Sequence, residues 1–147
     1  MRTYFSRLVF FPCLFALTSC GEESNSQIIK RSYEEVGDRE ILWSEVFDID
    51  KEDYLVYFYS PTCGHCRSIK DQMISYASDD SHNMYLVKFS DDAVVSTSVK
   101  NTIGITSVED LSILGTPSLI EIVMHTLTKN IAGSEAILEF LNLTSPD

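Results

Sequence analysis

Two closely spaced cysteines give this chain its clearest capacity for chemistry. Cys63 and Cys66 are separated by two residues, a spacing that lets one thiol attack a mixed disulfide formed by the other. The pair follows an apolar run at 54–59, typical of a buried strand, and opens a segment, 63–77, that reads as a helix. Because a helix N-terminus presents unpaired N–H groups and partial positive charge, it stabilises a thiolate. The pattern therefore predicts thiol–disulfide exchange.

The first nineteen residues have the pattern of an export signal. Two arginines precede a short apolar stretch at 8–17, which is too short to span a bilayer as a helix. The next residues, Leu-Thr-Ser-Cys at 17–20, resemble the lipobox of bacterial lipoproteins, in which the cysteine carries lipid and becomes the new N-terminus. We therefore expect a lipoprotein signal peptide at 1–19 and lipidation of Cys20. The alternative is an ordinary secretory signal followed by a chance cysteine.

Cleavage at this site settles the use of the four cysteines. Cys13 leaves with the signal and Cys20 carries lipid, so Cys63 and Cys66 remain as a single pair without a structural disulfide framework. The lipidated cysteine and a polar tether occupy 20–32. One domain, 33–147, follows, and it is large enough for a single hydrophobic core.

The chain is strongly acidic. Its formal net charge is −11 at pH 7, and removal of the signal with its two arginines and no acidic residue lowers this to −13. Such a charge argues against nucleic acid as a partner and against electrostatic adsorption to anionic lipid. We therefore expect a monomer held at the extracytoplasmic face of a bacterial membrane by the lipid on Cys20.

Hydrophobic periodicity predicts alternating helices and strands along the domain. The expected elements are an amphipathic helix or turn-plus-helix at 33–49 with Leu42, Trp43, Val46 and Phe47 toward the core, a strand at 54–59, a helix at 63–77, a strand at 84–89, a short helix near 92–101, a strand at 118–124, an antiparallel edge strand at 126–131, and a final helix at 135–141 capped by Ser134. This order favours an α/β domain with an antiparallel end.

The order of elements, the Cys-x-x-Cys motif after the first core strand, and Thr116-Pro117 before the third strand together resemble the thioredoxin superfamily over roughly residues 35–142. The resemblance implies a thioredoxin fold, in which helices flank a central mixed β-sheet. It further implies that Cys63 is the exposed nucleophile and that Cys66 is the more buried, resolving thiol.

The residues around the motif are similar to the active-site segment of protein disulfide isomerases. Gly64-His65 is the dipeptide that those enzymes place between their cysteines, and a positive histidine near the thiolate makes the disulfide more oxidising. Thr116-Pro117 matches the cis-proline loop of the family, whose backbone can pair with an extended substrate strand. A trans proline that merely starts a strand is the alternative.

Two positions depart from the family pattern. Many members carry a buried acid six residues before the nucleophile, to accept the proton of the resolving thiol. Tyr57 stands there in this chain and cannot act as a base at neutral pH. Lys88 matches a family lysine that pairs with that acid, so either Lys88 or a water molecule would have to handle the proton. Thr62 replaces the usual tryptophan and so reduces the expected substrate-contact surface.

A zinc site is the main alternative use of a Cys-x-x-Cys motif. Zinc needs about four ligands, whereas no further cysteine remains in the mature domain and the other histidines, His82 and His125, are isolated. We therefore expect no metal and no cofactor beyond the redox-active disulfide.

The sequence thus predicts an enzyme that exchanges disulfides with cysteine-containing exported proteins and is served by a membrane thiol-redox partner. It leaves the direction of electron flow open. The alternative is a non-catalytic binding or accessory lipoprotein with a static Cys63–Cys66 disulfide, which Tyr57 and Thr62 favour.

Overall fold

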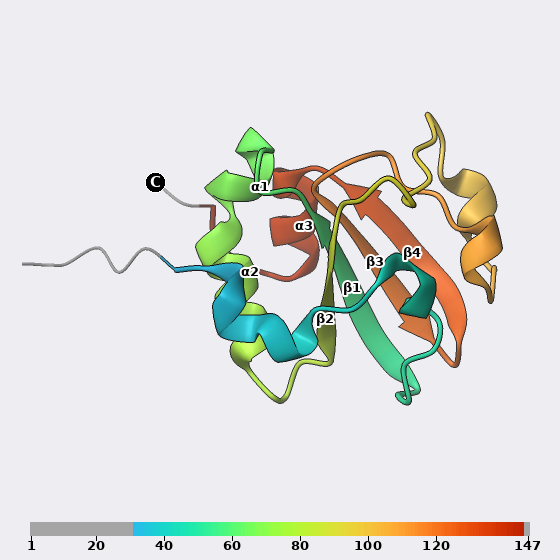
Figure 1. Cartoon of the computed structure of the whole chain (residues 1–147), viewed down its shortest axis with the longest axis horizontal. Coiled ribbons are helices and arrows are strands. Elements are labelled where there is room, and N and C mark those ends of the chain that lie inside the picture. The colour runs from blue at the N-terminus through green and yellow to red at the C-terminus, as the bar shows by residue number, and fades with distance from the viewer. Residues whose placement is uncertain (1–30, 146–147) are drawn as a thin grey trace, which may run out of the picture.

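A four-stranded β-sheet lies at the centre of the computed structural model, which describes residues 31–145 (Figure 1), and a hydrophobic cluster packs on each of its faces. The strands are β1 (Asp53–Tyr59), β2 (Met84–Lys88), β3 (Ser118–Val123) and β4 (Thr126–Ala132). Their order in the sheet is β2-β1-β3-β4, with β1 parallel to β2 and antiparallel to β3, and with β3 antiparallel to β4. The predicted α/β fold with a central mixed sheet is confirmed.

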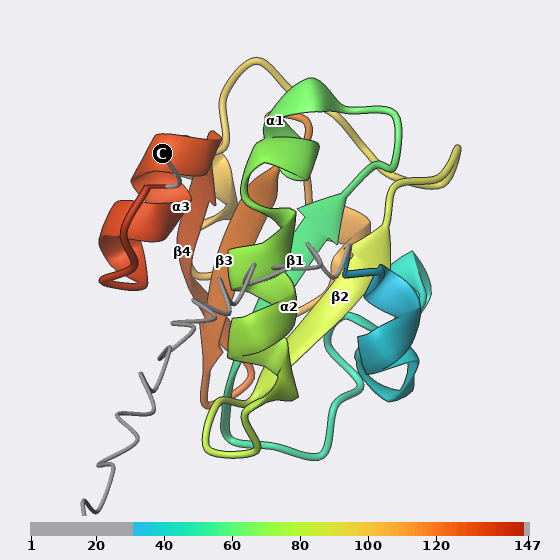
Figure 2. The same ribbon diagram turned by 90° about the vertical axis from the view of Figure 1, so that its left-hand side faces the viewer.

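Helices cover both faces of this sheet. The α-helices are α1 (Gly64–Ser68), α2 (Lys70–Ser78) and α3 (Ser134–Phe140), and the 3-10 helices are η1 (Tyr33–Arg39), η2 (Trp43–Glu45), η3 (Lys100–Thr102) and η4 (Val108–Asp110). Helices α2 and α3 pack with η1 on one face, as Figure 2 shows, whereas η2 and the segment that leads through η4 to β3 pack on the other.

The central strand β1 contributes side chains to both layers. Tyr57 and Tyr59 belong to the cluster under α2 and α3, and Val56 and Phe58 belong to the opposite cluster. All four are buried, as expected for a strand that is covered on both faces. Because β1 is fixed from both sides, the loop that follows it starts from a rigid point.

The helix predicted as continuous over 63–77 is broken at Ile69, whose φ of −112° and ψ of 9° are not helical. The hydroxyl of Ser68 donates to the carbonyl of His65 (2.8 Å), the group that would accept the Ile69 N–H in an unbroken helix. Local bonding of a serine side chain to the backbone thus accompanies the interruption.

The short helix predicted near 92–101 is wrong. This segment is mostly irregular, only its last two residues belong to η3, and a parallel bridge joins Val95 to Ile113. Ser96 donates its N–H to Ile113 O (2.9 Å), and its hydroxyl donates to Ser98 O (2.9 Å). Valine, serine and threonine are weak helix formers, so backbone pairing with a distant segment prevails over a local helix.

The N-terminal and C-terminal helices also differ from expectation. Two 3-10 helices, η1 and η2, replace the amphipathic helix or turn-plus-helix predicted over 33–49, and Leu42 is 66% exposed whereas Trp43 and Val46 are buried. At α3 the cap is Gly133 rather than Ser134, with a φ of 96° that glycine adopts without steric cost.

Candidate redox site

The cysteine pair lies at the junction of β1 and α1. Cys63 is the N-cap of α1, and its own N–H donates to Ser60 O (3.1 Å) across the short loop that follows β1. The N–H of Cys66 donates to Cys63 Sγ (3.3 Å). No disulfide joins the two cysteines in this structure. Cys63 is partly exposed, whereas Cys66 is 1% exposed, so only the first thiol is open to a large substrate.

The two thiols have opposite pKa shifts. Burial raises the pKa of Cys63, but hydrogen bonds from the Cys66 thiol and N–H, the Thr116 hydroxyl and the His65 N–H outweigh it and leave the pKa below its usual value. Burial raises the pKa of Cys66 to about 11. Near neutral pH, therefore, the accessible thiol is the readier nucleophile and the buried thiol keeps its proton.

The loop before β3 lies against the nucleophile. The peptide bond between Thr116 and Pro117 is cis. The Cys63 thiol donates to Thr116 O (3.2 Å), although 53 residues separate the two in sequence. Pro117 is buried and Thr116 is partly exposed. The pairing of β3 with β1 brings this loop to the cysteines.

The remaining motif residues lie on the surface beside the pair. Thr62, Gly64 and His65 are exposed. The Thr62 hydroxyl lies 3.0 Å from that of Ser60, and Thr62 O accepts from Arg67 Nη1 (3.0 Å). These contacts hold the loop in front of Cys63 and leave the His65 ring in solvent.

Lys88 does not belong to the buried cluster that contains Cys66. It is exposed at the end of β2, opposite Tyr59 in the sheet register. It lines two cavities together with Glu40, Ile41 and Leu42, and neither cavity includes Cys66. The Glu40 carboxylate accepts from the Tyr59 hydroxyl (2.8 Å).

Tyr57 occupies the position where the family resemblance leads one to expect an acid. It is fully buried in the cluster that also contains Cys66, and Tyr33 of η1 packs against that cluster. Burial raises the pKa of Tyr33 to about 12 and that of Tyr57 far above its ordinary range. Both are neutral phenols at neutral pH. Sequence analysis missed Tyr33, because nothing in the pattern of 33–49 links it to the cysteines.

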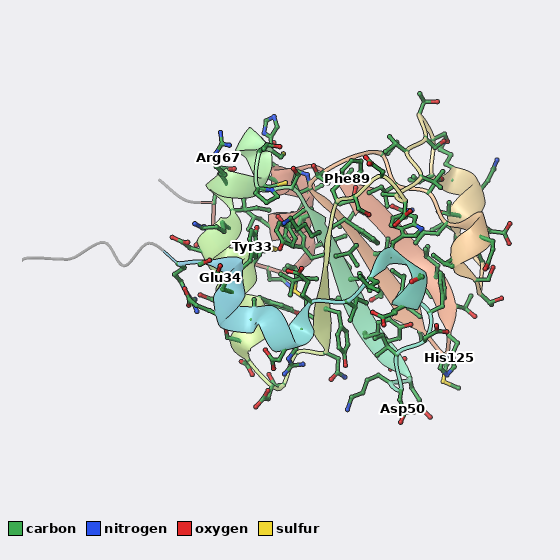
Figure 3. The ribbon with its side chains drawn as sticks, viewed as in Figure 1. Tyr33, Glu34, Asp50, Arg67, Phe89 and His125 are labelled. Carbon is green, nitrogen blue, oxygen red and sulfur yellow. The ribbon has the colours of Figure 1, made fainter. Side chains whose placement is uncertain are left out.

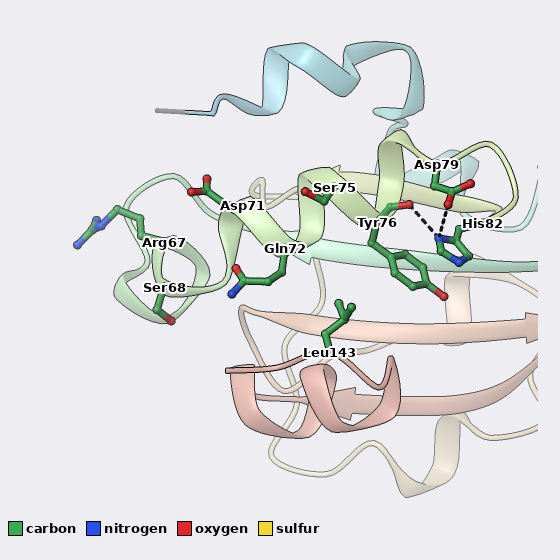
Figure 4. Close-up of a pocket in the computed structure, with 9 residues that line it drawn as sticks. All are labelled: Arg67, Ser68, Asp71, Gln72, Ser75, Tyr76, Asp79, His82 and Leu143. Carbon is green, nitrogen blue, oxygen red and sulfur yellow. Dashed lines mark hydrogen bonds and ion pairs between the residues drawn. The ribbon is translucent and has the colours of Figure 1, made fainter. Parts of the chain in front are cut away.

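A groove between α2 and the C-terminal segment lies near the pair but does not include it (Figure 4). Its volume is about 490 Å³, and it extends from Arg67 to His82, with Leu143 on the opposite side. The His82 ring stacks on Tyr76 with centroids 3.8 Å apart. Within residues 31–145, no group of three or more His, Cys, Asp or Glu side chains is arranged to hold a metal ion.

A mixed sheet with two cysteines between its central strand and the following helix is typical of one class of redox proteins. Sequence comparison assigns the chain to the same class. The family model described as Thioredoxin matches residues 38–134, more than half of the chain. The protein therefore belongs to the thioredoxin family, whose members are thiol–disulfide oxidoreductases. No curated protein matches the chain.

The solved structures to which this chain is similar are distant from it in sequence. Spinach chloroplast thioredoxin f is 15% identical, with a TM-score of 0.48 over 70% of this chain and 88% of that one. Mitochondrial thioredoxin 3 of Saccharomyces cerevisiae is 13% identical, with a TM-score of 0.49 over 74% and 97%. Thioredoxin from Aeropyrum pernix is 16% identical, with a TM-score of 0.45 over 69% and 82%.

Proposed function

We propose that the protein is a membrane-anchored, extracytoplasmic thiol–disulfide oxidoreductase that exchanges disulfides with exported proteins through Cys63 and Cys66. The observation that carries the proposal is the asymmetry of the pair. The accessible Cys63 has a lowered pKa, and the buried Cys66 has a raised one. This is the arrangement in which one thiol attacks and the other resolves.

In the reducing direction the reaction has two steps. The Cys63 thiolate attacks one sulfur of a client disulfide, so an intermolecular disulfide forms and the other client sulfur leaves as a thiolate that takes up a proton. Cys66 then loses its proton and attacks Cys63. The Cys63–Cys66 bond forms, the bond to the client breaks, and the second client sulfur leaves. The client gains two electrons and the cysteine pair loses them.

The loop at Thr116-Pro117 is proposed to orient the client. Thr116 O already lies 3.2 Å from Cys63 Sγ, and an extended peptide that delivers sulfur to Cys63 would run beside the Thr116 backbone. Thr62 and Gly64 are exposed on either side of Cys63 in the chain and would lie beside the bound client. His65 would add positive charge beside the forming thiolate when it is protonated.

Attachment to the membrane is proposed to come from lipid on Cys20. The support lies in the sequence, namely the basic and apolar segments before the Leu-Thr-Ser-Cys match at 17–20. Cys20 and most of the tether lie outside the described residues. Within residues 31–145, no helix is long and apolar enough to cross a membrane.

The reduction potential of the Cys63/Cys66 pair tests the proposed exchange and sets its direction. We expect the pair to equilibrate in glutathione buffers. A reduction potential of about −270 mV would indicate a reductase. A potential between about −180 and −120 mV would indicate an isomerase or an oxidase. Trapping the thiols by alkylation and counting them by mass spectrometry gives the value. A pair that does not equilibrate would favour the alternative, a binding lipoprotein with a static disulfide.

Replacement of Cys20 by serine tests the anchor separately. Expressed with its signal in a bacterial host, the unaltered chain is expected to incorporate labelled fatty acid and to enter the detergent phase on phase separation, because acyl chains bury apolar surface. The Cys20→Ser variant should do neither, whereas Cys13→Ser should behave as the unaltered chain. Equal labelling of all three proteins would contradict the anchor and leave the redox proposal intact.

A further inference from the structure

Two buried hydroxyl groups in the layer that holds Cys66 make no hydrogen bond of good geometry within the described residues, although each lies close enough to the other to shift its pKa. They belong to Tyr57 on β1 and Tyr33 on η1. Buried hydroxyls in proteins are normally paired, and a phenylalanine would fill the same space without leaving a polar atom unsatisfied. Tyr57 belongs to the cluster that contains Cys66, and Tyr33 packs against that cluster, so both polar groups are retained in the layer that holds the resolving thiol.

A cavity of about 300 Å³ connects this region to the surface. Tyr33 and Cys66 both line it, together with three basic residues, Arg31, Arg67 and Lys70. Arg67 is exposed, and Figure 3 shows that Tyr33 and Arg67 lie on the same side of the molecule, beside α1 and α2. A proton released at Cys66 therefore has a short path to solvent that does not pass Cys63.

We propose that Tyr57 and Tyr33 are positioning residues for the Cys66 thiolate in the resolving step, and that the proton of Cys66 leaves through the basic cavity. This inference rests on the exchange reaction proposed above. In this proposal two phenols and a cavity together allow Cys66 to lose its proton, a task that the family resemblance gives to a buried acid.

The chemistry of the step explains why neutral donors suffice. In the mixed disulfide Cys63 carries no charge, and Cys66 must lose its proton before it attacks Cys63 and releases the client sulfur as a thiolate. A buried thiolate is costly unless hydrogen bonds or positive charges compensate it. The phenol O–H groups can donate such bonds but cannot take the proton, which must therefore pass to water in the cavity.

Charges around Cys66 favour the same outcome. The titratable groups that line the cavity with Cys66 or act on this cluster are Cys63, Tyr33, Tyr57, Arg31, Arg67, Lys70 and Asp71. Arg67 and Lys70 favour a thiolate and oppose retention of its proton, whereas Arg31 adds less because it is paired with Glu35 (3.0 Å). Asp71 opposes them, but it is exposed on α2, where water screens its charge.

The test follows the two thiols separately in one reaction. The full chain carrying Cys13→Ser and Cys20→Ser is reduced and mixed with one equivalent of 5,5′-dithiobis(2-nitrobenzoate). A fast release of thionitrobenzoate reports attack by Cys63, and a second release reports attack by Cys66 on the mixed disulfide. The rate of the second phase is measured against pH in this background and in Tyr33→Phe, Tyr57→Phe and the double variant.

We expect the double variant to slow the second phase about tenfold at neutral pH and to move its pH midpoint up by about one unit, because a less stabilised thiolate forms at higher pH. The first phase should keep its rate and midpoint. Tyr33→Phe alone, which alters a partly exposed ring, should give part of the shift even if Tyr57→Phe folds poorly.

Tyr59→Phe is the matched control. Tyr59 lies on the same face of β1, and its ring packs 3.9 Å from that of Tyr33, but its hydroxyl donates to Glu40 (2.8 Å). It should leave the second phase unchanged. An unchanged midpoint in a folded Tyr33→Phe/Tyr57→Phe variant, or an equal shift in Tyr59→Phe, would overturn the tyrosine assignment alone. Failure of the unaltered pair to release the second equivalent would overturn the exchange reaction itself, and this inference with it.

Discussion

Replacement of Cys66 by serine is expected to convert the protein into a trap that stays covalently attached to its clients through Cys63. Cys63 remains partly exposed, keeps the hydrogen bond from the backbone N–H of residue 66 and still attacks, but no second thiol remains to release the mixed disulfide. Cys63→Ser should instead reduce the turnover rate more than about a thousandfold, because no other side chain replaces the lost nucleophile. Reduction of insulin by dithiothreitol measures turnover, and non-reducing gels show the trapped species.

The double variant Cys63→Ser/Cys66→Ser is the control for this experiment, and it should trap nothing. If Cys63→Ser traps clients and Cys66→Ser does not, the order of attack assigned from burial and pKa is reversed. Covalent attachment of several exported proteins to Cys66→Ser would indicate a general oxidoreductase, whereas a single trapped protein would indicate a dedicated client.

Replacement of Phe58 by alanine should produce the largest loss of stability. Phe58 is 1% exposed near the C-terminal end of β1, and its ring centroid lies 5.4 Å from that of Trp43. Truncating a buried phenylalanine costs about 3–5 kcal/mol, a large part of the roughly 5–15 kcal/mol that stabilises a domain. Urea unfolding followed by far-ultraviolet circular dichroism measures the change in the free energy of unfolding.

Phe89→Ala is the matched substitution at an exposed site. Phe89 follows β2 and is 38% exposed (Figure 3), so its loss should cost less than about 1 kcal/mol. Equal losses in the two variants would contradict the assignment of Phe58 to the core between β1 and η2. Because β1 leads directly to Cys63, we also expect the unfolded fraction of the Phe58→Ala protein to lose redox activity.

The site could be predicted from sequence wherever its signal is local. The apolar run of β1, the spacing of Cys63 and Cys66, and the position of the pair at a helix start all lie within fifteen residues. The hairpin of β3 and β4 was equally predictable, because two alternating strands separated by a short turn pair with each other. These features depend on residues that are close in sequence, and hydrophobic periodicity reflects the local structure of such residues.

The errors fall where distant segments decide the structure. The residues near Val95 are weak helix formers, and this segment pairs with Ile113 in place of forming the predicted helix. Leu42, which we predicted to face the core, is exposed and follows the backbone bridge between Glu40 and Leu86. In both places backbone pairing across the fold prevailed over a local pattern.

The sequence by itself determined which atoms react, because a thiol pair at this spacing after a buried strand is a local pattern. Only the tertiary structure decided what surrounds them. Pairing of β3 with β1 placed Thr116 O against Cys63, and packing of η1 on the sheet brought Tyr33 to the cavity of Cys66. The hydrogen bonds that shift the pKa of each thiol come partly from the motif itself, through Ser60 and His65, whereas Thr116 and the burial of Cys66 depend on segments that are remote in sequence.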